Sequence, residues 1–298
     1  MFRSPVLAEI QRLDPVRDHQ RIVLLCCRVD FPWDMTRSLE FALFRTFCVP
    51  SISALLDRTK EFERRSQKRY DDTDIIISEL MEHGYDSERG RAALARMNAI
   101  HGRFKIRNED FLYVLSTFVF EPIRWNARFG WRRMTEKERL AQFLFWRAAG
   151  ERMHIKDIPA GYDEFERYNI EYERANYRFT EANRRVGIAV RELFKSWFPR
   201  PAHPVVERAI HAFLDDRLIE TFGFPQPSAF SRRALEAALK LRARALRVVP
   251  RRRHPLLRTE MKQPTYPHGY QIEKLGPPED QERGSTDTRG GCPGRTDH

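Results

Sequence analysis

The sequence predicts an all-α fold, and three observations support this prediction. Apolar residues recur at helical spacing along most of residues 1–249. Glycine is sparse, with 14 residues in 298, and strand-like alternation is weak throughout. The chain is 41% hydrophobic and contains 21 phenylalanines, which is enough apolar material for a large core. We therefore expect one helical bundle.

The expected helices of the first half follow one another closely. In residues 51–62, one face carries Ile52, Leu55, Leu56, Thr59 and Phe62. A short, mostly buried helix is predicted over 74–83, ended by a glycine at 84. The next helix spans 87–101 and is closed by a glycine at 102.

Capping signals mark the helices of the second half. Asn108 can cap a helix over 109–121, which Pro122 then ends or kinks. Thr135 and Glu138 have the spacing of a capping box and open a helix that runs to Gly150. Three further stretches have helical patterns: 163–198, which is long enough to contain one break, 204–221 and 228–248.

The chain changes character after residue 249. Residues 250–276 form a basic, proline-containing extension, which we expect to pack loosely on the helical domain of residues 1–249. Residues 277–298 have almost no apolar side chains, so burial cannot offset the entropy of ordering them. We expect a disordered C-terminal tail.

The net charge of +11 favours anionic partners in general. Motifs for RNA recognition and zinc fingers are absent, so we do not expect nucleic acid as a partner. Contact with an anionic membrane surface stays open, and a monomer is slightly favoured over an oligomer. The four cysteines form no disulfide framework and no secretory segment is visible. We predict a cytoplasmic protein, with peripheral membrane location as the alternative.

Known catalytic motifs are absent from the sequence. It has no zinc or di-iron pattern of paired ligands, no phosphate-binding loop, no nucleophile elbow and no dinucleotide-binding glycine pattern. A cofactor held by one histidine remains, because haem needs one axial imidazole, an apolar slot and cations for its propionates. Four histidines lie in or beside helices, namely His83, His101, His154 and His211. From the residues alone, a core or surface position is the favoured interpretation for each.

A second stretch, "QKRYDDT" (67–73), bears on this question. If it is helical, Arg69 and Thr73 share one face because they are four residues apart. In the alternative interpretation, Asp71, Asp72 or Thr73 is the N-cap of the helix that follows, and Arg69 is solvated.

Together these stretches resemble the family of latex-clearing rubber oxygenases and MpaB-type oxygenases, on its MpaB-type branch. The matching pattern is "RYDDT" (69–73) followed about thirty residues later by "RMNAIH" (96–101). Further segments also read like this branch: "NEDFLYVLSTFVFEPIRW" (108–125), "FGWRRMTEKE" (129–138), "WRAAGERMHIKDIP" (146–159) and the pair Tyr172-Glu173. The resemblance is good over about residues 35 to 200.

The resemblance implies a helical bundle with a globin-like core enclosing haem b. His101 would be the proximal iron ligand, with its Nδ1–H donated to a carbonyl one turn back. Arg69 and Thr73 would form the polar pair near the haem. Asp72 stands where rubber oxygenases carry a lysine, and we group it with Arg69 and Thr73 as catalytic. The groups expected to hold the cofactor are His101, Arg69, Thr73, Arg103 and Arg124.

The resemblance also implies a function. We expect an oxidoreductase, a haem-dependent oxygenase of the dioxygenase type, whose partners are dioxygen and an apolar small molecule. It would oxidise or cleave a C=C bond of an isoprenoid-like or lipid substrate. Two alternatives stay open: a non-catalytic haem- or lipid-binding protein, and a basic helical module that binds nucleic acid or membrane without metal.

Overall fold

The computed structural model describes residues 5–250 and 252–277, and it confirms the all-α prediction. Within these ranges no strand forms, and the one β-bridge, between Gln263 and Tyr266, is isolated. The helices are α1 (Pro5–Arg12), α2 (His19–Leu25), α3 (Pro32–Phe47), α4 (Pro50–Thr59), α5 (Glu61–Arg64), α6 (Ser66–His83), α7 (Glu88–His101), α8 (Asn108–Phe129), α9 (Glu136–Arg152), α10 (Tyr162–Asn176), α11 (Glu181–Ser196), α12 (His203–Phe213), α13 (Asp216–Phe222) and α14 (Ala229–Leu246).

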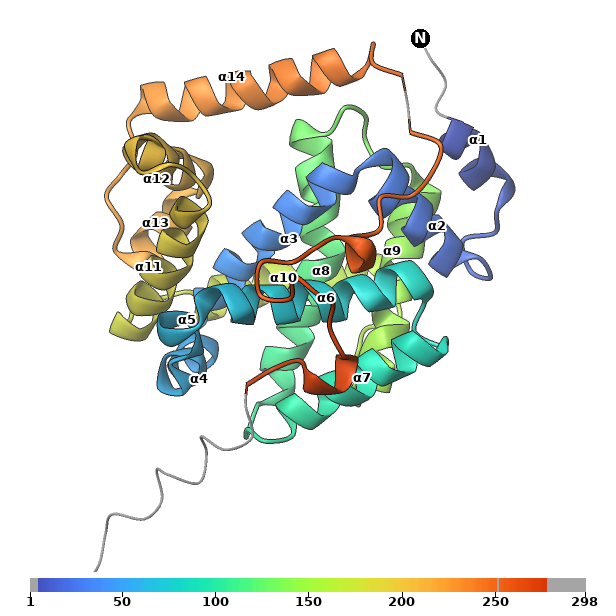
Figure 1. Ribbon diagram of the computed structural model, residues 1–298, viewed down its shortest axis with the longest axis horizontal. Coiled ribbons are helices and arrows are strands. Elements are labelled where there is room, and N and C mark those ends of the chain that lie inside the picture. Colours follow the sequence, from blue (N-terminus) through green and yellow to red (C-terminus); the bar gives the residue numbers. More distant parts are fainter. Residues whose placement is uncertain (1–4, 251, 278–298) are drawn as a thin grey trace, which may run out of the picture.

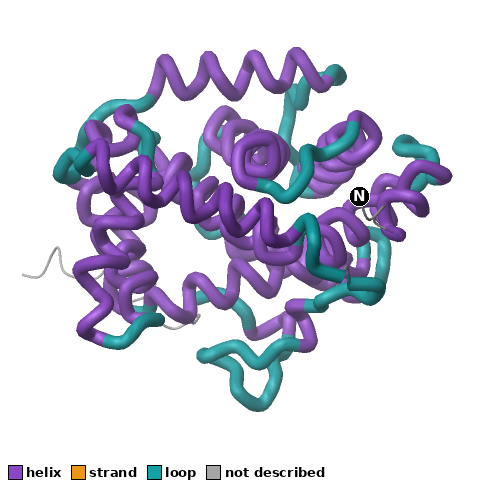
Figure 2. Tube along the Cα trace, turned by 90° about the horizontal axis from the view of Figure 1, so that it is seen from above, coloured by secondary structure: helices purple, strands orange, loops and turns teal. Residues whose placement is uncertain are grey.

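Helix α8 runs through the middle of the bundle (Figure 1), where α3, α9 and α10 pack against it. Helices α6 and α7 pack on each other, and α11 to α13 gather on one side with α4 and α5. Apolar side chains form two adjoining cores. One core is centred on α2 and α6 to α9, and the other on α3, α11 and α13. Figure 2 shows the same helices from above, joined by loops.

Several helix limits follow the local signals. Thr135 and Glu138 form the expected capping box, with reciprocal side-chain and backbone hydrogen bonds, and α9 runs slightly beyond Gly150. Gly84 ends α6 with a φ of 80°, a conformation that glycine adopts without strain. The predicted helix over 163–198 is indeed broken once, between α10 and α11.

Two predicted helices are each divided in the structure. Residues 51–62 form α4 and α5, because Lys60 between them takes a left-handed conformation with a φ of 57°. Residues 204–221 form α12 and α13, because Asp215 caps a new helix by accepting a bond from the backbone N–H of Leu218.

Pro122 does not end the helix, and the expectation that Asn108 caps it is wrong. Helix α8 continues to Phe129 with Pro122 inside it. Proline lacks the N–H that would bond the carbonyl of Phe118, but the side chain of Gln142 on α9 donates to that oxygen at 3.1 Å. The side chain of Asn108 makes no cap and instead bonds the backbone of Lys156 in both directions.

The N-cap interpretation of residues 71–73 is also wrong, because α6 begins at Ser66. Side chains four residues apart tie its first turns together. Gln67 donates to Asp71 at 2.8 Å, and Lys68 pairs with Asp72 at 2.8 Å. The acidic side chains are therefore engaged with the preceding turn of the helix.

The segment 252–277, here called the C-terminal strap, lies across α6 and α7 (Figure 1). It contains the short 3-10 helices Arg258–Glu260 and Ile272–Lys274. Arg258 pairs with Asp74 of α6 at 2.6 Å, and Leu275 is completely buried. The expected loose packing is thus wrong for this segment. The tail predicted over 277–298 lies outside the described residues from 278 onward.

In the described ranges, no single helix has both the length and the hydropathy expected of a transmembrane segment. Helices α3 and α4 reach these values only when their residues are taken together, and they are bent by 98° relative to each other.

Candidate active site

An apolar cavity of about 500 Å³ lies between α3, α4, α6, α7 and α8. This volume is within the usual range for pockets that bind small molecules. The end of α9 and the last residues of the strap complete the wall. The cavity is lined by many aliphatic and aromatic side chains, including Leu39, Leu43, Phe47, Leu55, Phe62, Ile76, Met97, Phe104, Phe111, Val114, Phe118, Trp146 and Ile155.

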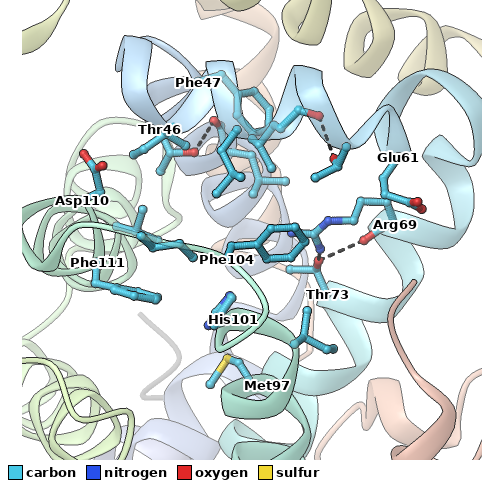
Figure 3. A pocket seen from close by; sticks show the side chains of 18 of the residues that line it. Thr46, Phe47, Glu61, Arg69, Thr73, Met97, His101, Phe104, Asp110 and Phe111 are labelled. Atoms are coloured by element: carbon cyan, nitrogen blue, oxygen red, sulfur yellow. Dashed lines mark hydrogen bonds between the residues drawn. The ribbon is translucent and has the colours of Figure 1, made fainter. Parts of the chain in front are cut away.

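His101 is the last residue of α7, and its ring faces this cavity (Figure 3). Its ring centroid lies 5.2 Å from that of Phe111, edge to face. The Nδ1 atom is buried and has no hydrogen-bond partner among the described residues. The predicted bond from Nδ1 to a carbonyl one turn back is therefore absent.

The surroundings of His101 keep its imidazole neutral. Burial, and secondarily the positive charge of Arg69, lower the pKa of His101 to about 4. At pH 7 the ring therefore carries one lone pair, which is the form that binds a metal. Because Nδ1 has almost no exposed surface, a metal would have to bind at the other ring nitrogen, Nε2.

Arg69 and Thr73 approach the same cavity from α6 (Figure 3). The Arg69 guanidinium donates to the Thr73 hydroxyl, and that hydroxyl donates to the Arg69 carbonyl at 2.9 Å. Burial lowers the pKa of Arg69. Its guanidinium lies 5.5 Å from the ring of Phe62 and forms no ion pair with a carboxylate of the described chain. A buried cation of this kind suits an anionic ligand.

Asp72 also lines the cavity, but its carboxylate is engaged with the strap. It accepts bonds from Lys68 and from the Tyr266 hydroxyl. Lys68 in turn donates to Tyr266 at 2.8 Å and to the carbonyl of Gly276 at 3.0 Å. Asp72 therefore links the site to the strap. Sequence reasoning missed Lys68 and Tyr266, although the i,i+4 spacing of Lys68 and Asp72 was visible.

The end of the strap forms part of the cavity wall through Gly276 and Pro277. Gly276 has a φ of +94°, and a Cβ there would lie 2.5 Å from Cδ1 of Ile100, the neighbour of His101. Only glycine fits this position without strain.

The structure does not bring Arg103 and Arg124 to the cavity. Arg103 donates to the carbonyl of Pro277 at 3.5 Å. Arg124 bonds Glu121 at 2.9 Å and Asn169 at 2.8 Å. Neither side chain lines the cavity, so the structure brings together four of the predicted residues, namely Arg69, Asp72, Thr73 and His101.

A small side chamber of about 40 Å³ adjoins the main cavity and shares Tyr70 and Thr73 with it. Glu40 lines this chamber, and it accepts bonds from the Tyr70 hydroxyl and from Arg37, both at 2.6 Å. Burial raises the pKa of Glu40 to about 7. No pattern in the sequence indicated this carboxyl group.

The donor set favours a particular kind of metal group. Among residues 5–250 and 252–277, no three His, Cys, Asp or Glu side chains gather as they would around a bare ion. One imidazole suffices for a group that brings its other ligands with it, as a porphyrin does. The indole nitrogen of Trp146, which also lines the cavity, is buried and has no hydrogen-bond partner among the described residues. The residues that line the cavity fit a largely apolar ligand.

A family profile described as "ER-bound oxygenase mpaB/B'/Rubber oxygenase, catalytic domain" matches residues 40–248. The chain belongs to this family. The matched range contains almost all of the cavity-lining helices, whereas the C-terminal strap lies beyond it.

Individual relatives carry the same description. The chain is 31% identical over 209 residues to an ER-bound oxygenase mpaB of Penicillium roqueforti, covering 64% of this chain and 70% of the relative. It is 29% identical over 219 residues to ER-bound oxygenase mpaB' of Penicillium brevicompactum, covering 67% of this chain and 52% of that relative. A mpaB of the same organism is 35% identical over 147 residues, covering 47% of this chain and 38% of that protein.

Proposed function

We propose that the chain is a haem-b-dependent oxygenase that oxidises or cleaves a C=C bond of an apolar, isoprenoid-like or lipid substrate. Membership of an oxygenase family supports the reaction class. The observation that carries the haem proposal is the neutral imidazole of His101, which lines the apolar cavity (Figure 3). When bound, haem would supply the redox-active iron for reaction with dioxygen.

The residues of the cavity have distinct roles in this proposal. His101 would hold the haem iron. Arg69 inside the cavity, together with Arg58 and Lys105 at its exposed edge, offers positive charge to the two propionates. The hydroxyl of Thr73 holds the guanidinium of Arg69 in place. We assign no propionate contact to Arg103 or Arg124, because neither lines the cavity.

The apolar lining selects the substrate and excludes water. Burial of an unsaturated hydrocarbon chain against aliphatic and aromatic side chains contributes roughly 25 cal/mol per Å² of apolar surface removed from water. If both atoms of one dioxygen molecule are incorporated, cleavage of one C=C bond gives two carbonyl groups without external electrons. We therefore propose the dioxygenase type over a monooxygenase.

The proposal is tested with haem-loaded protein, dioxygen and a farnesylated phenol, with the saturated side-chain analogue as control. We expect dioxygen uptake with the unsaturated compound alone, and ¹⁸O from labelled dioxygen in both carbonyl products. Label in one product atom with a requirement for a reductant would overturn the dioxygenase assignment. Binding of haem and of the probe without turnover would contradict the enzyme proposal and support a non-catalytic carrier.

A further inference from the structure

Helix α14 lies across one edge of the bundle (Figure 1). One face of it carries exposed apolar side chains. Phe230 is 80% exposed and Leu241 is 66% exposed, although both are large hydrophobic residues. Val248, just beyond the helix, is 73% exposed. At 100° per residue, Phe230, Ala234, Ala237, Ala238, Leu241 and Ala245 fall in one sector of about 100°.

The opposite face of α14 is fixed to the bundle. Arg242 pairs with Asp34 of α3 at 2.9 Å, and Glu236 pairs with Arg128 of α8 at 3.0 Å. Ala243 is buried. These contacts set the rotation of the helix, so the apolar stripe is held facing outward.

The charges beside the stripe are all positive. The side chains of Arg233 and Arg244 are exposed and have no ion-pair or hydrogen-bond partner within the described ranges. Arg252 and Arg253 follow the helix and are also exposed. The one acidic side chain of α14, Glu236, lies on the inner side and is paired. An apolar stripe flanked by cations is complementary to an anionic lipid surface.

We propose that the outward face of α14 docks in the plane of an anionic membrane surface. An 18-residue helix is about 27 Å long. Its six charged residues exclude a spanning position, whereas the amphipathic arrangement suits the interface between headgroups and acyl chains. The apolar stripe inserts, and Arg233 and Arg244 contact lipid phosphates. This proposal is independent of the haem and of the reaction.

Two other occupants fit the face less well. A second copy of the chain would bring the cations of one α14 against those of the other, which opposes pairing. Residues 278–298 of the chain contain no Leu, Ile, Val, Met or aromatic side chain that could cover the stripe. An anionic lipid surface satisfies both the apolar and the charged part.

The test is co-sedimentation of the full chain with vesicles of phosphatidylcholine containing 30% phosphatidylserine. We expect binding that weakens as salt is raised and is at least tenfold weaker on pure phosphatidylcholine. The variant Phe230→Ser/Leu241→Ser should weaken binding at least tenfold. Arg233→Glu/Arg244→Glu should weaken it by about 30-fold or more on the anionic vesicles, since each cation near the surface contributes about a factor of five.

Two control variants distinguish binding through this face of α14 from nonspecific hydrophobic or electrostatic adsorption to the vesicles. Ile170→Ser on α10 removes an exposed apolar residue, and Arg64→Glu/Arg184→Glu on α5 and α11 reverses two exposed cations. Both controls should bind vesicles within twofold of the native chain. Equal losses in controls and α14 variants would overturn the proposal. So would a dimer in light scattering that the Phe230→Ser/Leu241→Ser variant abolishes.

Discussion

Glu40 provides a test of the buried polar structure beside the cavity. The residue is 7% exposed, and burial is the main reason that its pKa is raised to about 7. Arg37 and Arg258 lower the pKa, as does the bond from Tyr70, while Asp74 raises it. In the unfolded chain the group titrates near 4.5. The unfolded state therefore binds fewer protons between these values, and stability falls as pH rises from about 4.5 to 7.

The gap between 4.5 and about 7 corresponds to about 3 kcal/mol, of which about 2–3 kcal/mol is lost between pH 5 and pH 8. Glu40→Gln removes the titration and keeps an oxygen that accepts from Tyr70. We therefore expect the variant to gain stability relative to the native chain as pH rises. The difference in free energy of unfolding, variant minus native, should be about 2–3 kcal/mol larger at pH 8 than at pH 5.

The assay is urea unfolding followed by far-ultraviolet circular dichroism at both pH values. As a control, Glu207→Gln removes a carboxylate whose pKa is lowered, chiefly by its bond with Lys195. Its contribution is lost only as pH falls through the acid range, so the two pH values should agree closely. If Glu40→Gln changed the free energy of unfolding equally at pH 5 and pH 8, the pKa of Glu40 would not be raised in the folded chain.

Three further predictions concern the cavity and the C-terminal strap beside it. Tyr266→Phe removes a donor to the buried Asp72 and should lower the free energy of unfolding by about 1.5–3 kcal/mol in urea, while weakening haem binding measured by Soret titration. Gly276→Ala places a Cβ against Ile100 at a φ of +94°, and should cost about 1–3 kcal/mol in the same assay. Arg69→Met removes a partly buried cation that forms no ion pair in the described chain, so the haem-free chain should become more stable by about 1 kcal/mol and bind haem at least tenfold more weakly.

Tyr270→Phe is the matched control for Tyr266→Phe. Its hydroxyl also joins the strap to a buried carboxylate of α6, that of Glu79, which keeps a salt bridge to Arg89. It should reduce stability without changing haem affinity. Equal haem affinity in both tyrosine variants would contradict the role given to Tyr266. For Arg69→Met, a loss of stability in the haem-free chain would show that the guanidinium is better neutralised than we infer.

The sequence predicts helices well where the signal is local. The Thr135 capping box depends on residues three apart, and it forms as expected. The Arg69 to Thr73 spacing likewise places both side chains on one face once α6 is helical. His101 and this pair could therefore be singled out from the sequence and a family resemblance.

Errors arose where a distant residue supplies the missing partner. Pro122 stays inside α8 because Gln142 bonds the carbonyl that the proline leaves free. Asp72 does not cap a helix, because Lys68 and Tyr266 take up its carboxylate. Tyr266 is 194 residues away from Asp72 in sequence, and no periodic pattern links them. Such contacts depend on tertiary packing and cannot be read from local propensity.

The absorption spectrum of the purified chain shows whether the imidazole of His101 binds the iron of haem b. The matched control is His211→Ala, since His211 is also buried with a lowered pKa but lies against Phe224, away from the cavity. We expect one haem per chain with a Soret band that His101→Ala abolishes and His211→Ala retains. A colourless native chain after haem reconstitution, or an unchanged Soret band in His101→Ala, would contradict the account.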